Sequence, residues 1–130
     1  MILPRLSAAL LSMNYLGTAY TPSGLPNKNT VKQWALISGA ANGAASVMGV
    51  GVADLQAHRR TARQHLIRYA EEKGLELDGF ELLFDLGSQE GGKIVMRRRD
   101  ILASEHSGLV RGFHHDKVIS YPRLKLALDS

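Results

Sequence analysis

The chain contains no cysteine, only four prolines and few aromatic residues. The absence of cysteine excludes disulfides, cysteine nucleophiles and thiolate metal sites, although it does not define the compartment. Aromatic residues make up 6% of the chain, which argues against the base-stacking platforms that nucleic-acid-binding domains commonly use. The 130 residues suffice for one domain, or for one membrane span with modest flanking parts.

Motifs that commonly mark an enzyme are also missing. The sequence contains no nucleophile elbow of the hydrolase type, no phosphate-binding loop with its lysine, and no zinc-binding His-Glu-x-x-His helix. Glycine-rich segments are present, but none follows a clear strand and opens a helix with the spacing that binds phosphates. We therefore expect no enzymatic activity and no cofactor.

Histidines and carboxylates gather near the C-terminus, at Glu105, His106, His114, His115 and Asp116. Imidazole and carboxylate groups together are typical zinc ligands. Adjacent histidines rarely converge on one ion, however, so surface or partner contacts are the simpler interpretation. The sequence predicts no metal site here.

One long stretch is free of charge. Residues 33–53 contain no Asp, Glu, Lys, Arg or His, and a helix of about 21 residues covers roughly 30 Å, the thickness of a bilayer's hydrocarbon core. Small residues gather on one side of such a helix, where backbones can approach closely and Ser or Asn can form interhelical hydrogen bonds. We expect this side to pack against a partner helix; it comprises Ala35, Ser38, Gly39, Asn42, Gly43 and Ser46.

Basic residues flank the charge-free stretch. Lys32 lies directly before it, and Arg59, Arg60 and Arg63 follow it. We expect these four side chains to contact lipid headgroups or a partner subunit. The formal net charge of the chain is +4, and the excess of arginine after the stretch predicts that this side faces the cytoplasm or the mitochondrial matrix.

Two other interpretations of residues 33–53 stay open. The stretch is rich in glycine, alanine, serine and asparagine, so its hydropathy is modest for a membrane span. Glycine is also a poor helix former in water. The segment could therefore be a buried helix of a soluble domain, or a glycine-rich loop.

We expect a mainly α fold in which a single transmembrane helix continues into a basic amphipathic helix, followed by short helices and an extended C-terminal tail. A glycine at position 74 is a plausible stop for the basic helix, and residues 87–92 are expected to form a turn. The expected parts are an N-terminal apolar, interfacial helix that also suits a targeting segment (1–20), a linker (21–30), the transmembrane helix (31–53), the basic helix (54–74) and a small C-terminal region with the tail (75–130).

The run from Lys32 to Gly43, KQWALISGAANG, resembles the signature of subunit e of mitochondrial ATP synthase. In that family a basic and an aromatic residue open a single span with a Gly-x-x-x-Gly motif, and a charged helix follows. The resemblance implies that Gly39 and Gly43 pack against the span of another subunit and contribute to dimerisation of the complex. This sequence departs from the pattern at Asn42, where the family often has an aromatic residue, and in its C-terminal region.

These observations lead to one expected function and two alternatives. The expected function is that of a non-catalytic, single-pass accessory subunit of a mitochondrial inner-membrane complex, either ATP synthase or the respiratory chain. Its partners would be other membrane subunits and membrane lipids, including anionic ones. The arginine clusters suit a soluble, basic component of a ribonucleoprotein such as the mitochondrial ribosome. The glycine-rich turns would suit a small soluble α/β domain that binds a ligand.

Overall fold

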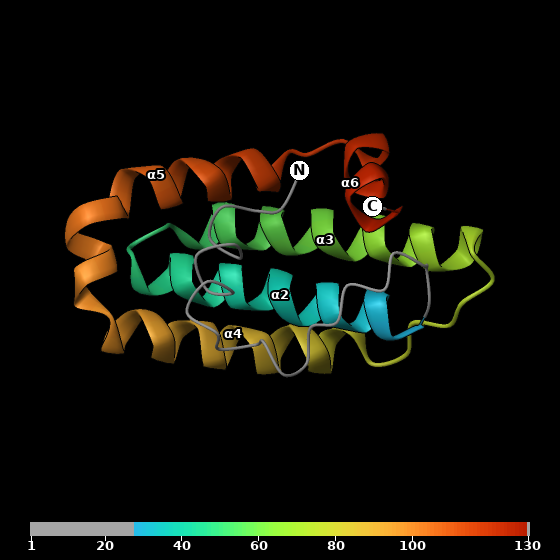
Figure 1. Ribbon diagram of the computed structural model, residues 1–130, viewed down its shortest axis with the longest axis horizontal. Coiled ribbons are helices and arrows are strands. Elements are labelled where there is room, and N and C mark those ends of the chain that lie inside the picture. Colours follow the sequence, from blue (N-terminus) through green and yellow to red (C-terminus); the bar gives the residue numbers. More distant parts are fainter. Residues whose placement is uncertain (1–27, 130) are drawn as a thin grey trace.

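Five α-helices form a bundle in the part of the chain that the structure describes (Figure 1). The computed structural model describes the backbone of residues 28–129 and the side chains of residues 31–98 and 107–129. The expected helix over residues 1–20 and most of the expected linker lie outside the described residues. No strand occurs from residue 28 to residue 129, so the mainly α fold is confirmed for this part. The helices are α2 (Lys28–Val47), α3 (Val52–Glu72), α4 (Phe80–Arg97), α5 (Arg99–Lys117) and α6 (Tyr121–Asp129).

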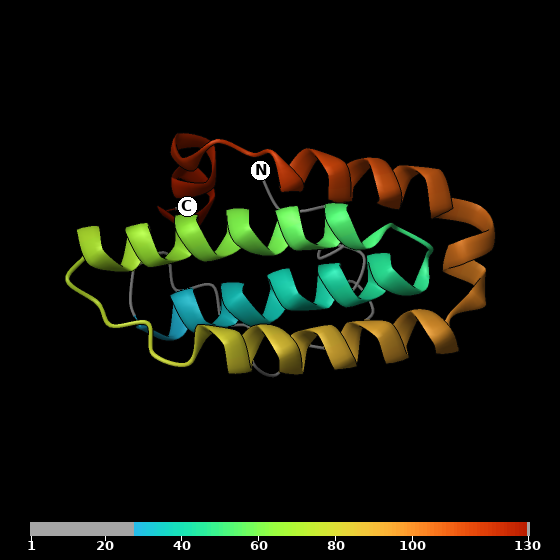
Figure 2. The same cartoon turned by 180° about the vertical axis from the view of Figure 1, so that it is seen from behind.

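Helix α2 lies at the centre of the arrangement, between α3 and α4 (Figures 1 and 2). The α2 and α4 helices run parallel, because Gly39 lies against Phe84 and, one turn further along both helices, Gly43 lies against Ser88. Helix α3 runs antiparallel to α2, and α5 runs beside α3. The short α6 lies across α3 near its C-terminal end (Figure 1).

The charge-free stretch is not one helix, contrary to the prediction for residues 31–53. The chain reverses direction between α2 and α3, so the predicted continuous rod is wrong. Gly49 adopts a φ of +95°, and the N–H groups of Gly49 and Val50 donate to the carbonyls of Ser46 and Ala45, at 3.1 and 3.0 Å. This pair of bonds is the Schellman motif, which ends helices and favours glycine at the left-handed position.

Three further expectations about the fold need correction. None of the helices between residues 28 and 129 is both long and apolar enough to cross a membrane, so the predicted transmembrane helix is not found there. The predicted turn at residues 87–92 lies inside α4, and the predicted extended tail consists mostly of α5 and α6. These helices form because their apolar side chains have partners in the bundle, and such packing overrides weak local propensity.

The buried apolar side chains form two clusters along α2. Helix α2 contributes to both clusters, which explains why its composition is so poor in charge. The first surrounds the N-terminal half of α2 and contains the larger rings, including Trp34, Tyr69, Phe80, Phe84 and Tyr121. The second surrounds its C-terminal half and includes Ala41, Ala44, Met48, Val95, Leu109 and Phe113.

Candidate functional site

Four glycines bring the backbones of α2 and α4 into direct contact. Gly39 and Gly43 lie on α2, and Gly87 and Gly91 lie at the same spacing on α4. A Cβ atom on any of them would overlap a main-chain carbonyl oxygen of the opposite helix. Such close approach also places Cα–H groups next to carbonyl oxygens, which is a weak but favourable contact. The facing carbonyls belong to Phe84, Ser88, Leu36 and Ala40.

The residues predicted to pack against a partner helix therefore take different positions within the molecule. Gly39 and Gly43 lie in a helix contact, and the helix that they contact is α4 of the same chain. Ala35 and Ser38 are buried. Asn42 faces α3, whereas Ser46 is exposed near the end of α2.

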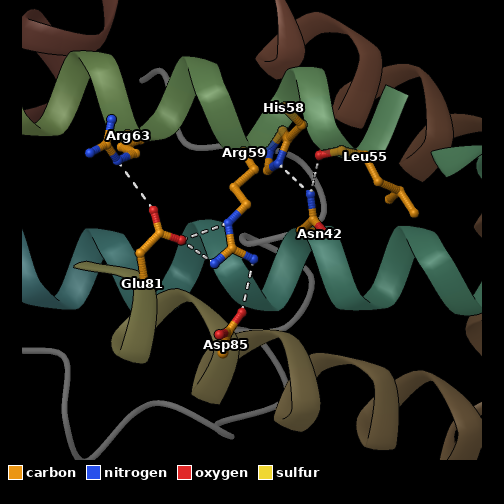
Figure 3. Close-up of polar contacts among 7 residues, drawn as sticks. All are labelled: Asn42, Leu55, His58, Arg59, Arg63, Glu81 and Asp85. Carbon is orange, nitrogen blue, oxygen red and sulfur yellow. Dashed lines mark hydrogen bonds and ion pairs between the residues drawn. The ribbon is translucent and has the colours of Figure 1, made fainter. Parts of the chain in front are cut away.

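Asn42 connects α2 to α3 through a polar contact inside the bundle (Figure 3). Its Nδ2 donates to the carbonyl oxygen of Leu55 at 2.9 Å, and the same Nδ2 lies 3.1 Å from His58 Nδ1. Since a carbonyl only accepts, the amide orientation is fixed, and the second hydrogen of Nδ2 points to the imidazole. His58 Nδ1 is then the acceptor, which leaves the ring proton on Nε2.

His58 is deeply buried, with 3% of its surface exposed. Its ring stacks on Phe113, with centroids 4.6 Å apart, and lies 6.3 Å from the ring of Phe84. Burial lowers the pKa of His58 to about 4, because the charged imidazolium cannot be hydrated there. The imidazole is therefore neutral at neutral pH.

Two arginines of α3 pair with acidic residues of α4, and we call Arg59, Arg63, Glu81 and Asp85 the Arg59 cluster (Figure 3). Arg59 donates through Nε and Nη2 to Glu81 and through Nη1 to Asp85, the latter at 2.8 Å. Arg63 Nε lies 3.2 Å from Glu81 Oε1. The guanidinium of Arg59 also lies over the ring of Phe84, 4.7 Å from its centroid. The cluster thus joins α3 to α4 across α2.

The other two predicted basic contacts do not belong to this cluster. Lys32 is partly buried on α2, and Arg60 is exposed on α3. Neither forms an ion pair with any side chain that the structure describes. Whether these four basic residues contact lipid or another subunit stays a prediction.

Asp116 on α5 is a buried carboxylate with an incomplete set of partners. It is 8% exposed, and its Oδ2 has no hydrogen-bond partner in the described part of the chain. Its Oδ1 lies 3.6 Å from His115 Nδ1. Burial raises the pKa of Asp116 to about 6, and His115 opposes that shift. A cavity of about 20 Å³ lies beside it and is also lined by His58.

Helix α6 packs on α3 through the buried Tyr121, Leu124 and Leu128, and polar side chains at its edges add hydrogen bonds and ion pairs. Glu72 Oε1 accepts hydrogen bonds from Tyr121 Oη at 2.8 Å and from Lys125 Nζ at 3.0 Å. Lys125 and Tyr121 together lower the pKa of Glu72 to about 2, because both donors stabilise the ionised carboxylate. Tyr69 Oη donates to Asp129 Oδ1 at 2.7 Å. These contacts hold the C-terminal helix in place.

The outward face of α4 is partly apolar. The five residues that we call the outer stripe follow one another at alternating distances of four and three residues, the spacing of a coiled-coil seam. The three apolar members, Leu82, Leu86 and Met96, are 65%, 45% and 66% exposed. Gln89 and Lys93 are the other two members of the outer stripe, and they lie between Leu86 and Met96.

Among the residues that the structure describes, no three His, Cys, Asp or Glu side chains gather where they could hold a metal ion. Sequence reasoning missed Gly87 and Gly91, although their spacing equals that of Gly39 and Gly43. It also missed the outer stripe, whose spacing of four and three is visible in the sequence.

Comparisons with known proteins bring no further identification. No protein-family model matches the chain, and neither a curated protein nor a solved structure is detectably similar to it. The function must therefore be argued from the geometry described above.

Proposed function

We propose that this protein is a non-catalytic subunit of a larger assembly, which binds an amphipathic helix of another protein along the outer stripe of α4. The observation that supports this most is the exposure of Leu82, Leu86 and Met96 at coiled-coil spacing. Exposed apolar side chains arranged in a row are typical of interaction surfaces, whereas isolated ones are common on any protein.

The rotation of α4 about its own axis is set by its glycines. Gly87 and Gly91 fit only where α2 passes, because a side chain at either position would meet the α2 backbone. The outer stripe lies on the opposite side of the helix, so α4 cannot turn it inward without losing this fit. Its exposure is thus built into the fold of the single chain.

Charges beside the outer stripe indicate the chemistry of the partner. Asp85 borders it on one side and Glu90 on the other, and both carboxylates are substantially exposed. Asp85 pairs with Arg59 and Glu90 with Lys93, so the edges of the outer stripe carry paired charges of both signs. A helix with apolar residues at spacings of three and four and mixed charges at its edges would match this surface. The proposed role is thus that of an accessory subunit in a hetero-oligomeric complex. It requires neither a membrane span nor a particular compartment.

RNA binding is less well supported. That alternative relied on the arginine clusters, but Arg59 and Arg63 already pair with carboxylates of α4. Their charge is therefore partly neutralised within the molecule, and fewer basic groups are left for phosphates.

Site-specific crosslinking in the cells that produce the protein tests the proposal. A photoreactive residue placed at Leu86 should give one discrete adduct with another protein, whereas the same residue at Val52, which is even more exposed, should not. The substitution Leu82→Glu should abolish the adduct while changing the free energy of unfolding by less than about 0.5 kcal/mol, as expected for an exposed position. Adducts at both positions, or at neither, would contradict the proposal. An adduct with a second copy, or with residues 1–27 of the same chain, would show that one of these occupies the outer stripe and would contradict the proposed partner.

A further inference from the structure

The small cavity beside Asp116 has a polar lining that neither the fold nor the proposed function explains. It lies where α2, α3, α5 and α6 meet, and has a volume of about 20 Å³. The residues of its lining that can form hydrogen bonds include Ser38, His58, Thr61 and Asp116. Trp34 and Leu124 contribute to its apolar walls.

The strongest indication of a bound molecule is Asp116 Oδ2. This atom is buried and finds no hydrogen-bond partner among the described residues, although an unpaired buried polar group is costly and most native structures avoid it. Among the side chains that the structure describes, His115 alone pairs with the carboxylate, 3.6 Å from the other oxygen. The cavity is therefore where a partner for Oδ2 would lie.

The size and lining of the cavity suit one water molecule. A cavity holds a water when its volume exceeds roughly 10–15 Å³ and it offers two to four polar partners. His58 carries its proton on Nε2, because its Nδ1 accepts from Asn42. The Thr61 hydroxyl donates to the carbonyl oxygen of Lys117 at 2.6 Å, so its oxygen can still accept a hydrogen bond.

We propose that this cavity binds one water molecule, which donates a hydrogen bond to Asp116 Oδ2 and links α5 to α2 and α3. A divalent cation does not fit the lining, because the described residues contain no group of three or more metal-ligating side chains. A water can donate or accept, so it suits a lining of hydroxyls, an imidazole and a carboxylate. Ile119, which lies between α5 and α6, and Leu124 of α6 complete the lining on the C-terminal side.

A crystal structure of the full chain at high resolution tests the assignment. We expect one peak of solvent density within about 3.2 Å of Asp116 Oδ2, and we expect it to vanish in Asp116→Leu, which fills similar space without an acceptor. The exposed substitution Val118→Ala is the matched control and should retain the peak. An empty cavity, a direct bond from Oδ2 to a protein group, or a peak that persists in Asp116→Leu would overturn the proposal. Replacement of the peak by rubidium after soaking would identify a cation and overturn it as well.

A measurement in solution covers the case in which Asp116→Leu does not fold. In the unmodified protein, the ring protons of His58 should show a nuclear Overhauser effect to a long-lived water molecule. The exposed ring of His115 provides the reference for rapidly exchanging surface water. If His58 shows no effect from a long-lived water, the cavity is dry and the proposal fails.

Discussion

The contact between α2 and α4 and the contact between α3 and α6 are built in opposite ways. In the first, backbone meets backbone at Gly39, Gly43, Gly87 and Gly91, and no side chain lies between the helices at these points. In the second, hydroxyl, carboxylate and ammonium groups span the gap, with Glu72 at the centre. One helix pair depends on the absence of side chains, whereas the other combines buried side chains such as Leu124 and Leu128 with polar groups at its edges.

The difference determines how each contact responds to change. Main-chain atoms cannot move aside individually, so an added methyl group between α2 and α4 displaces a whole helix. The polar contact is shared among several flexible side chains, so the loss of one hydrogen bond costs only about 1 kcal/mol. We therefore expect the α2–α4 pair to be the most stable part of the bundle and α6 to be the part that opens most easily.

The largest effect is expected when a methyl group is added between α2 and α4. In Gly91→Ala the new Cβ would overlap the carbonyl group of Ala40, and the nearest atoms belong to the backbone. The two helices must then separate, which should lower the free energy of unfolding by roughly 3 kcal/mol or more. Urea denaturation followed by circular dichroism measures the loss.

The neighbouring glycine provides a matched control for that substitution. In Gly92→Ala the new methyl group would lie 3.4 Å from Val47 Cγ2 and 3.6 Å from the carbonyl oxygen of Gly43, which are ordinary contacts. The higher helix propensity of alanine should then stabilise the protein by up to about 1 kcal/mol. If both substitutions destabilise the protein equally, close backbone approach is not the reason for Gly91.

Local sequence rules predicted one half of the α2–α4 contact and missed the other. The small-residue face with Gly39 and Gly43 could be inferred because the charge-free stretch has a clear helical period. The local pattern predicts a turn at Gly87 and Gly91, since glycine disfavours helices when only neighbouring residues are considered. Their role depends on α2, which is distant in sequence, and local propensity does not include such a partner.

The ends of the helices show a similar division. The sequence predicts Gly74 as a helix stop, and it adopts a φ of +68° just after α3. Gly49 lies in the charge-free stretch, where the sequence predicts a continuous helix, although it ends α2 in the same way. The two glycines differ in their sequence neighbours. Charged residues surround Gly74, whereas apolar residues surround Gly49 and favour the interpretation of a continuous apolar helix. The sequence also gave no indication that His58 and Asp116 share a cavity, because they belong to different helices.

A change of pH should act on the buried ionisable groups Asp116 and His58, and not on the glycine contact between α2 and α4. Asp116 has a pKa of about 6 in the folded protein, against an ordinary value of 3.8, so its contribution to stability falls as the pH rises through that range. His58 has a pKa of about 4, against 6.5, so its contribution rises with pH over nearly the same range. The two groups therefore oppose each other in the unmodified protein.

Single substitutions should separate these two contributions. In Asp116→Asn only His58 is left, so the free energy of unfolding should increase with pH between about 4 and 6.5. At neutral pH this variant should be more stable than the unmodified protein by on the order of 2 kcal/mol, because no charge is buried. In His58→Gln the free energy of unfolding should instead decrease as the pH rises. Urea denaturation at a series of pH values tests both, and identical pH profiles in all three proteins would refute the assignment.

The smallest effect is expected at the attachment of α6. In Tyr121→Phe the hydrogen bond to Glu72 is lost, while Lys125 still pairs with that carboxylate. The ring also keeps its position under the guanidinium of Arg68, whose central carbon lies 4.1 Å from the ring centroid. The loss should be about 1 kcal/mol and should appear mainly as faster hydrogen exchange in α6, with the amides of α2 and α4 unchanged. Equal acceleration in all helices would mean that α6 opens only with the whole bundle, so the two contacts would not differ in local stability.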